Sequence, residues 1–253
     1  MADSCFVTKL KHYLDLTAAE QKALSVLEEG EYSVAAGEVV FAEESGDADA
    51  LYVVRDGLLH SSRLMKDGGR QILRIFHPGD VMGTASIAFA KPSSTAVAAV
   101  DSSICRFPKT SLMSIYTDYP RLAALFYSLG MLENVVLCDR LRSIGRSDGE
   151  ARIALLLLDF RDRLKITRPG TAEAFDLPLT QADISDAIGM TPIHTNRLFM
   201  RMRTEGLIEW TKGHVRLLDE KRLADLSDYV NRYESLDKSW YPQPTTGSQQ
   251  DGV

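Results

Sequence analysis

Hydrophobic positions are spaced differently in the two halves of the chain. From about residue 31 to residue 107, short apolar runs are separated by turn residues, whereas later apolar residues recur at three- and four-residue steps. The first spacing is typical of β-strands and the second of amphipathic helices. Many short strands in succession predict a sandwich, barrel or β-roll. Strands are expected at residues 39–41, 51–55, 58–64, 71–76, 95–100 and 103–107, after one or two short helices within residues 6–29.

A long helix is expected from about residue 119 to residue 146. Its apolar residues alternate three- and four-residue steps, which is the heptad pattern of a packed seam. Such a stripe can pack against the helix's own domain or against a second copy of the chain, and the spacing alone allows both. The stripe consists of Leu122, Leu125, Leu129, Leu132 and Val136.

The length of 253 residues is enough for two domains. A second domain is expected to begin at a hinge near Ser147-Asp148-Gly149, with a helix over residues 151–164 and a loop over residues 167–174. The polar composition near the C-terminus predicts a disordered tail. The expected segments are a β domain with N-terminal helices (1–118), a long helix (119–146), a second domain (147–232) and the tail (233–253).

Two closely spaced helix starts form the clearest motif of the chain. Thr180 is a good N-cap with Asp183 three residues later, and Gly189 tolerates the left-handed conformation that ends many helices. Thr191 and Pro192 can then begin a second helix within three residues. A turn this short is what a helix-turn-helix requires.

The second of these helices has one inward and one outward face. Thr195, Leu198, Phe199 and Met202 recur at helical spacing and should pack inward. On the outward face, Asn can bond adenine and Arg can bond guanine through two hydrogen bonds each, while Ile and Pro offer contact to a thymine methyl. The candidate DNA contacts are Thr180, Gln181, Thr191, Pro192, Ile193, His194, Asn196, Arg197, Arg201 and, in the segment that follows, Lys212.

A pair of short strands follows this helix. Residues 207–210 and 215–218 flank Lys212-Gly213 and predict a hairpin, or wing, that could reach phosphates. Two amphipathic helices separated by a glycine could also belong to an ordinary helical core. The immediate second start, the polar outward face and the hairpin in this order favour DNA binding.

Composition and charge narrow the function classes. With 45% hydrophobic and 25% charged residues the chain is typical of a soluble protein, and no apolar run approaches the roughly 20 residues of a membrane span, so a cytoplasmic location is expected. The net charge of −6 opposes DNA binding, but the excess acid lies mainly within residues 1–120. Neither an enzyme motif nor metal-ligand spacing of the five histidines is visible, so no metal, cofactor or catalytic activity is expected.

Three cysteines are widely separated along the chain. Their number and spacing do not suggest a disulfide framework in a cytosolic protein. An iron–sulfur cluster normally needs four thiolates, which one chain cannot supply here. No redox role is assigned to Cys5, Cys105 or Cys138.

The order of these elements and the motif from Thr180 to Arg197 resemble the superfamily of the cyclic AMP receptor protein and the fumarate and nitrate reduction regulator (Crp/Fnr). The resemblance implies an α+β fold with an effector-binding β-roll, a long dimerisation helix and a C-terminal winged helix-turn-helix. Many members carry Glu, then Ser or Gly, then Arg on the recognition helix, where this chain has Ile193, Asn196 and Arg197. The mode of DNA binding therefore carries over, but the base sequence that is read does not.

The effector pocket departs from the family pattern. Nucleotide-binding members hold the ribose with a Gly-Glu pair and the cyclic phosphate with an Arg-Ser pair, where this chain has Gly83-Thr84 and Ser94-Thr95. Without that carboxylate and that cation, cyclic AMP is not expected to bind by the usual contacts. No replacement cluster of charged residues is visible beside Gly83, so either no effector binds or an unidentified one does. The candidate pocket residues are Gly83, Thr84, Ser86, Ser94 and Thr95, although small polar residues are more often turns and strand surface.

The resemblance implies a transcription regulator that binds an inverted repeat in double-stranded DNA as a homodimer. Two-fold symmetry doubles the short site that one recognition helix can read, and we therefore assign the leucine stripe at 122–136 to the dimer seam. RNA polymerase is a further candidate partner. The alternative is an interaction module that binds a ligand or a protein and whose DNA face has lapsed, which the replacement of the usual Glu by Ile193 keeps open.

Overall fold

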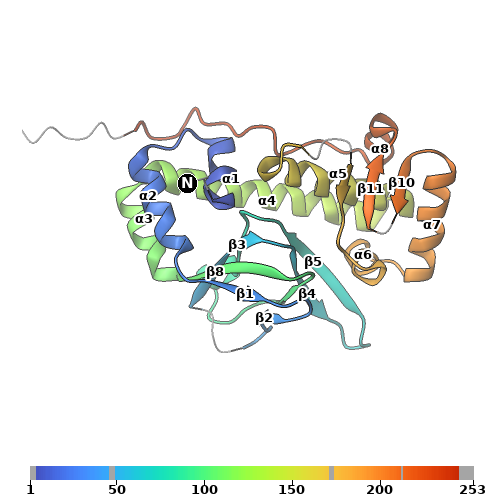
Figure 1. Cartoon of the computed structure of the whole chain (residues 1–253), viewed down its shortest axis with the longest axis horizontal. Helices are drawn as coiled ribbons and strands as arrows, with labels where there is room; N and C mark the ends of the chain where they lie inside the picture. Colours follow the sequence, from blue (N-terminus) through green and yellow to red (C-terminus); the bar gives the residue numbers. More distant parts are fainter. Residues whose placement is uncertain (1–3, 46–48, 171–173, 212, 245–253) are drawn as a thin grey trace, which may run out of the picture.

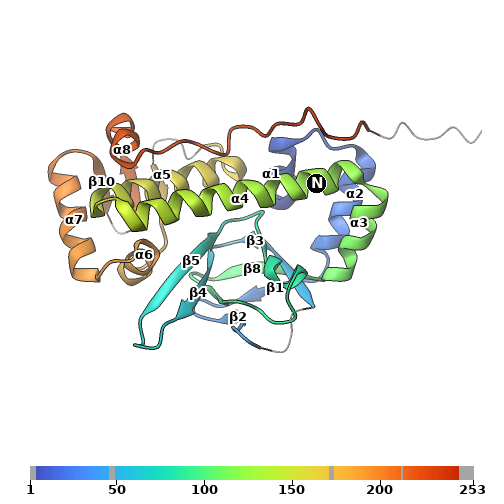
Figure 2. The ribbon, with the colours of Figure 1, turned by 180° about the vertical axis from the view of Figure 1, so that it is seen from behind.

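The computed structural model describes residues 4–45, 49–170, 174–211 and 213–244, and it has the expected α+β architecture. The long helix α4 (Pro120–Arg146) crosses the molecule. The β domain lies along one side of this helix, the N-terminal helices lie at one end and the C-terminal domain lies at the other (Figures 1 and 2).

In the described residues, the β domain consists of two four-stranded antiparallel sheets with the orders β1-β8-β3-β6 and β2-β7-β4-β5. Apolar residues such as Val54, Leu59 and Ile104 fill the space between them. The six expected strands are confirmed to within two residues, whereas β1 and β6 were missed because one is mostly exposed and the other very short. The strands are β1 (Glu31–Val34), β2 (Val39–Phe41), β3 (Ala50–Asp56), β4 (Leu59–Leu64), β5 (Arg70–Phe76), β6 (Val81–Met82), β7 (Thr95–Ala98) and β8 (Ser102–Pro108).

Short helices close one end of the β domain. The helix α1 approaches the turn after β5 so closely that a Cβ atom at Gly79 would lie 2.7 Å from the Cys5 carbonyl oxygen. Gly79 also has φ +87°, a conformation that favours glycine, so this contact depends on it. The elements are α1 (Cys5–Tyr13), α2 (Ala18–Ser25), η1 (Val26–Glu28), η2 (Thr84–Ile87), η3 (Lys109–Ser111) and α3 (Leu112–Asp118).

The leucine stripe of α4 faces its own chain, which corrects the dimer seam assigned from the sequence. Its residues pack against α1, α3 and the β domain in one core, and four of them are buried in the single chain while Leu129 is partly buried. A buried side chain cannot also form the interface with a second copy. The heptad pattern of Leu122, Leu125, Leu129, Leu132 and Val136 therefore reports intramolecular packing, the alternative that spacing could not exclude.

The opposite face of α4 carries a second set of residues at heptad spacing. These residues, which we call the outer stripe, are exposed and mostly apolar: Tyr127, Met131, Asn134, Cys138 and Leu141. By length and composition α4 would also qualify as a membrane span, contrary to the sequence-based expectation, although a single helix of this kind is weak evidence. The other face of the helix is fixed in the protein core.

The C-terminal domain packs around α5. Its core includes Leu157, Phe160, Ile184, Phe199 and Val215. The loop expected over residues 167–174 is shorter than predicted, since residue 167 ends α5 and residue 174 begins β9, while residues 171–173 lie outside the described part. The elements are α5 (Gly149–Thr167), β9 (Ala174–Asp176), α6 (Gln181–Ile188), α7 (Pro192–Thr204), β10 (Ile208–Thr211), β11 (His214–Leu217) and α8 (Glu220–Ser227).

Residues 229–244, which we call the C-terminal strap, run from α8 back along α4 toward the N-terminal helices (Figures 1 and 2). Tyr233 and Tyr241 are buried, and the Tyr233 hydroxyl donates a hydrogen bond to the Asp159 carboxylate. The Nε2 atom of His12 in α1 lies 2.8 Å from the Tyr233 carbonyl oxygen. The prediction of a disordered tail from residue 233 is therefore wrong for residues 233–244, and residues 245–253 lie outside the described part.

We expect Tyr233→Ala to lower the free energy of unfolding by about 3 to 5 kcal/mol, because it removes a buried aromatic ring and leaves the Oδ1 atom of Asp159 without its donor, while Arg140 still pairs with Oδ2. Tyr116→Ala, at a tyrosine that is 48% exposed, should cost less than about 1 kcal/mol. Denaturant titration of both variants tests this. Equal losses of unfolding free energy in the two variants would show that the strap does not stabilise the fold.

Candidate functional site

The helices α6 and α7 form a helix-turn-helix. The Thr180 hydroxyl accepts a hydrogen bond from the Asp183 N–H while the Asp183 carboxylate accepts one from the Thr180 N–H, a complete capping box. Gly189 ends α6 in the left-handed conformation with φ +67°. The two buried hydroxyls of Ser185 and Thr195 are hydrogen-bonded at 3.0 Å, which fixes the crossing of the helices.

The second helix buries one face and exposes the other. Thr195, Leu198, Phe199 and Met202 are buried, as the sequence predicts. Ile193 is 78% exposed and is therefore available for contact with DNA. All the predicted contact residues of α7 are exposed: Pro192, Ile193, His194, Asn196, Arg197 and Arg201, together with its N-cap Thr191.

Other predicted contacts lie in different settings. Thr180 and Gln181 stand at the exposed N-terminus of α6, although the Thr180 hydroxyl is already engaged in the cap. The Arg201 guanidinium pairs with Glu150 of α5, so at least one of its roles is intramolecular. Lys212 lies outside the described residues.

The wing has one strand more than the sequence suggested. β10 and β11 pair as expected, and β9 adds a third strand on the far side of β11. The signal for β9 is the alternation in residues 175–179, where Phe175, Leu177 and Leu179 are buried and the residues between them are exposed. Trp210 contacts Phe199 edge-on at 4.0 Å between ring centroids and so ties the wing to α7.

The β domain holds α6 through charged contacts that sequence reasoning missed. Arg70 of β5 donates to Asp183 at 2.5 Å and to Asp186 at 2.7 Å, and the Gln71 amide donates to the Asp186 carbonyl oxygen. Burial raises the pKa of Asp183, but hydrogen bonds from Thr180 and Arg70 outweigh it and hold this pKa below its usual range. No local pattern links Arg70 to residues more than 110 positions away.

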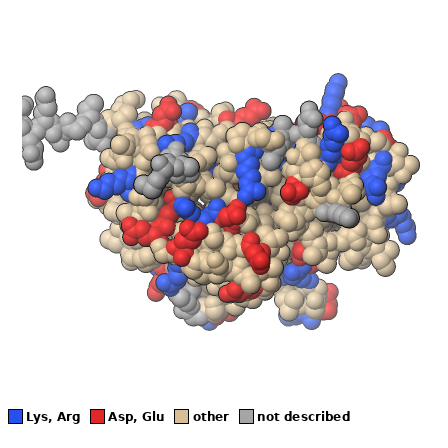
Figure 3. Space-filling view, viewed as in Figure 1, with Lys and Arg blue, Asp and Glu red and all other residues tan. Residues whose placement is uncertain are grey.

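Charge is unevenly distributed over the surface. On the face drawn in Figure 3, acidic side chains gather over the β domain, while several basic side chains project from the end that holds α7 and α8. This distribution favours approach of DNA to the helix-turn-helix end.

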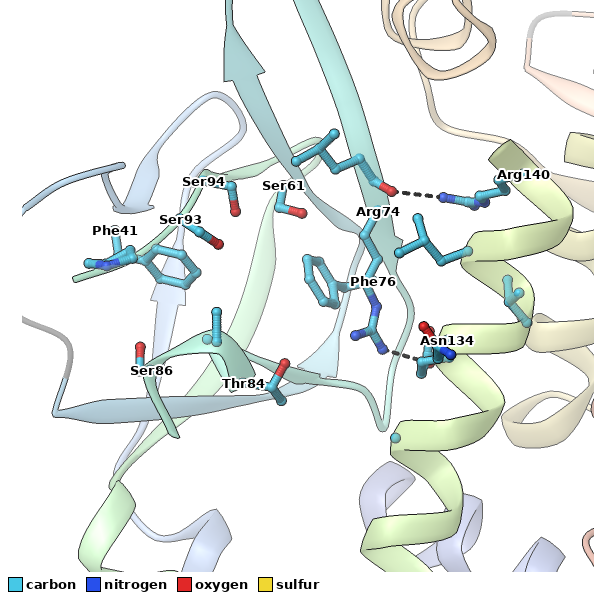
Figure 4. Close-up of a pocket in the computed structure, with 18 of the residues that line it drawn as sticks. Phe41, Ser61, Arg74, Phe76, Thr84, Ser86, Ser93, Ser94, Asn134 and Arg140 are labelled. Atoms are coloured by element: carbon cyan, nitrogen blue, oxygen red, sulfur yellow. Dashed lines mark hydrogen bonds and ion pairs between the residues drawn. The ribbon is translucent and has the colours of Figure 1, made fainter. Parts of the chain in front are cut away.

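A cavity of about 510 Å³ lies between the β domain and α4, and we call it the effector cavity (Figure 4). Four of the candidate pocket residues, Gly83, Thr84, Ser86 and Ser94, are among the residues that line it. Thr95 is not among its lining residues, and its hydroxyl instead accepts a hydrogen bond from the Glu43 N–H at 3.0 Å.

Charged residues also line the effector cavity, which corrects the expectation that none replaces the missing family contacts. Arg74 pairs with Glu133 at 2.6 Å, and Arg140 donates to the Leu73 carbonyl oxygen at 3.2 Å. Figure 4 shows both pairs bridging from β5 to α4. These residues, with Arg163 of α5, come from three distant segments, so the sequence around Gly83 could not reveal them.

A buried ion cluster adjoins the cavity and consists of Lys9, Arg74, Asp80, Glu133 and Arg163, of which Arg74, Glu133 and Arg163 also line the cavity. Asp80 pairs with Lys9 and, at 2.5 Å, with Arg163, while Glu133 lies 3.6 Å from Arg163. Burial raises the pKa of Asp80, but Arg163 and Lys9 lower this pKa by more than burial raises it, so the carboxylate stays ionised. Burial and Arg163 hold the pKa of the adjacent His77 well below its usual range, which keeps this imidazole neutral.

Comparisons with known proteins match both the C-terminal domain and the β domain. A Crp-like helix-turn-helix domain matches residues 151–226, and a cyclic nucleotide-binding domain matches residues 31–119. The nitrogen fixation regulation protein FixK of Bradyrhizobium diazoefficiens is 30% identical over 191 residues, which are 76% of this chain and 79% of that protein. The transcriptional activatory protein AadR of Rhodopseudomonas palustris is 28% identical over 75% of this chain and 78% of its own length.

A solved structure shows the same fold. FixK2 from Bradyrhizobium japonicum superimposes with a TM-score of 0.71 at 26% identity, covering 79% of this chain and 98% of FixK2. The β domain, α4 and the helix-turn-helix therefore follow one another in the same order as in known regulators. The chain belongs to the Crp/Fnr family of DNA-binding transcription regulators, which are not enzymes.

Proposed function

We propose that this regulator binds an inverted repeat in bacterial DNA as a homodimer, acts in the cytoplasm and does not respond to cyclic AMP through the usual contacts. The observation that carries the proposal is the outward face of α7, where Asn196 and Arg197 are exposed beside Ile193 on a helix fixed by caps at its start. Asn and Arg are suited to read adenine and guanine edges in the major groove.

The outer stripe of α4 supports the dimer. Tyr127, Met131, Asn134, Cys138 and Leu141 follow the alternating four- and three-residue steps of a two-helix seam. A polar Asn within such a seam favours one register at some cost in stability. Two chains joined along α4 would present two recognition helices with two-fold symmetry, which corresponds to half-sites about 34 to 36 Å apart.

The same face borders the effector cavity. Asn134 belongs to the outer stripe and also lines the cavity. The exposed Leu137 lies outside the outer stripe but lines the cavity too. A partner helix on the outer stripe would therefore lie next to the open side of the cavity. An effector bound there would contact, or lie close to, the dimer interface.

Arg197→Ala should weaken binding to the preferred duplex by about 1 to 3 kcal/mol, since a base contact is lost, and should weaken binding to random duplex much less. The preferred duplex is first selected from random DNA, and both affinities are then measured at one salt concentration. Arg203→Ala, near the end of the same helix, is the matched control and should affect both duplexes alike. If no sequence is enriched, the interaction-module alternative is correct; an equal loss on both duplexes would limit Arg197 to phosphate contact.

Leu141→Asp should convert the dimer to a monomer, because it places a charge in the last apolar position of the proposed seam. Leu141 is 70% exposed in the single chain, and Leu64 of β4 is 74% exposed but does not belong to the outer stripe. Leu64→Asp therefore makes the same chemical change at equal exposure and should leave the dimer intact. Light scattering at micromolar concentration decides, and a monomeric parent protein would refute the dimer.

Titration with cyclic AMP or cyclic GMP should give no saturable heat at micromolar concentration. Thr84 and Ser94 line the cavity without the carboxylate and guanidinium that hold ribose and cyclic phosphate in nucleotide-binding members. The melting temperature and the DNA affinity should be equally unaffected, because a ligand stabilises a state only by binding it. Saturable micromolar heat with either nucleotide would show that other residues replace the missing contacts.

A further inference from the structure

A second cavity, of about 280 Å³, lies between the N-terminal helices, the β domain and α4. It shares Arg74, Thr84, Gly130 and Glu133 with the effector cavity but is otherwise separate. Its other walls are mainly apolar side chains from six elements, namely Phe6, Leu27, Leu51, Phe107, Leu112 and Phe126. An apolar cavity of about 150 Å³ is enough to bind benzene, so this one has room for an apolar body of about ten heavy atoms.

The polar part of this cavity is formed by the buried ion cluster. Lys9, Arg74 and Glu133 line the cavity, and Asp80 and Arg163 complete the cluster behind them. The cluster therefore contains three cations and two carboxylates, and one positive charge has no counterpart within it. Lys9 and Arg74 are partly exposed, at 14% and 24% of their side chains, so the excess positive charge can be reached by one more anion.

Arg74 is the cation best placed to meet such an anion. One of its terminal nitrogens pairs with Glu133 at 2.6 Å, but its Nε atom is buried without a hydrogen-bond partner in the described structure. Its guanidinium lies 4.8 Å from the centre of the Phe76 ring, which holds it in place. Figure 4 shows Arg74 reaching from β5 toward α4. Arg74 lines both cavities. The Glu133 pair engages only one terminal nitrogen, and the side chain is 24% exposed, so the guanidinium can also bind a carboxylate oxygen that enters the cavity.

We propose that the second cavity binds a small amphipathic carboxylic acid, with its apolar body among Phe6, Leu27 and Phe107 and its carboxylate on Arg74. Two exposed apolar residues, Ile87 and Tyr116, also line this cavity and mark its solvent-facing side. The site is distinct from the cyclic-nucleotide position around Gly83 and Ser94, and the proposal does not depend on DNA binding.

Calorimetric titration of the full-length protein without DNA tests the proposal. Octanoate and 3-phenylpropanoate share a carboxylate on an apolar body of suitable size, and each should give saturable heat with one site per chain. Octan-1-ol keeps the apolar body without the charge and should bind at least about tenfold more weakly. Absence of saturable heat with both acids, or equal affinity for octanoate and octan-1-ol, would overturn the proposal.

Matched variants locate the site. Arg74→Gln should weaken octanoate binding at least about tenfold, whereas Arg63→Gln, in the neighbouring strand β4 and paired with Glu43 outside both cavities, should not. Leu112→Trp fills only the second cavity and should abolish binding, whereas Leu73→Trp fills only the effector cavity and should not. Retained binding in Arg74→Gln, or loss only in Leu73→Trp, would refute the site. Should either cavity variant fail to fold, the comparison of acid with alcohol in the parent protein still decides.

Discussion

The buried ion cluster around Asp80 and Arg163 is the interaction on which the arrangement of the chain depends. Its members come from α1, the β domain, α4 and α5, and each carboxylate is held by cations from at least one other segment. Removing one partner from a buried pair typically costs about 3 to 5 kcal/mol, because the other charge is left uncompensated. The cluster therefore favours the one arrangement in which all four segments meet, whatever its net contribution to stability.

The helix α4 has two faces with different roles. Its leucines complete the core beneath the β domain, while the outer stripe stays exposed at the same heptad spacing. A helix that is apolar on both sides is apolar enough overall to resemble a membrane span, which explains that property without a bilayer. The cavities lie on the side of α4 that faces the β domain, so one helix connects the ligand-sized spaces with the proposed dimer contact.

The helix-turn-helix is held by the rest of the chain rather than projecting freely. Asp183 serves both as the capping residue of α6 and as the acceptor for Arg70 of the β domain. On the opposite side, the strap joins the C-terminal domain to α1 through Tyr233. Any rotation of the domain that moved α6 away from β5 would break the Arg70 pairs and expose partly buried charge.

The sequence by itself determined the structural features that depend on residues close together along the chain. All strands described in the β domain except β1 and β6, the caps at Thr180 and Thr191, the turn at Gly189 and the outward face of α7 follow from periodicity and capping, which act within a few residues. The resemblance to the Crp/Fnr family rested on these local features, and the comparisons confirm it.

Only the tertiary structure decided which partner each pattern meets. Heptad spacing is the same for an intramolecular and an intermolecular seam, so packing alone assigned Leu122 and its neighbours to the core and left Leu141 exposed. The polar composition after residue 233 predicted disorder, but Tyr233 and Tyr241 of the strap are buried against the folded chain. The ion cluster joins residues separated by up to 154 positions, from Lys9 to Arg163. Charges so far apart have no sequence signature, because only the fold brings them within the few ångströms at which they interact.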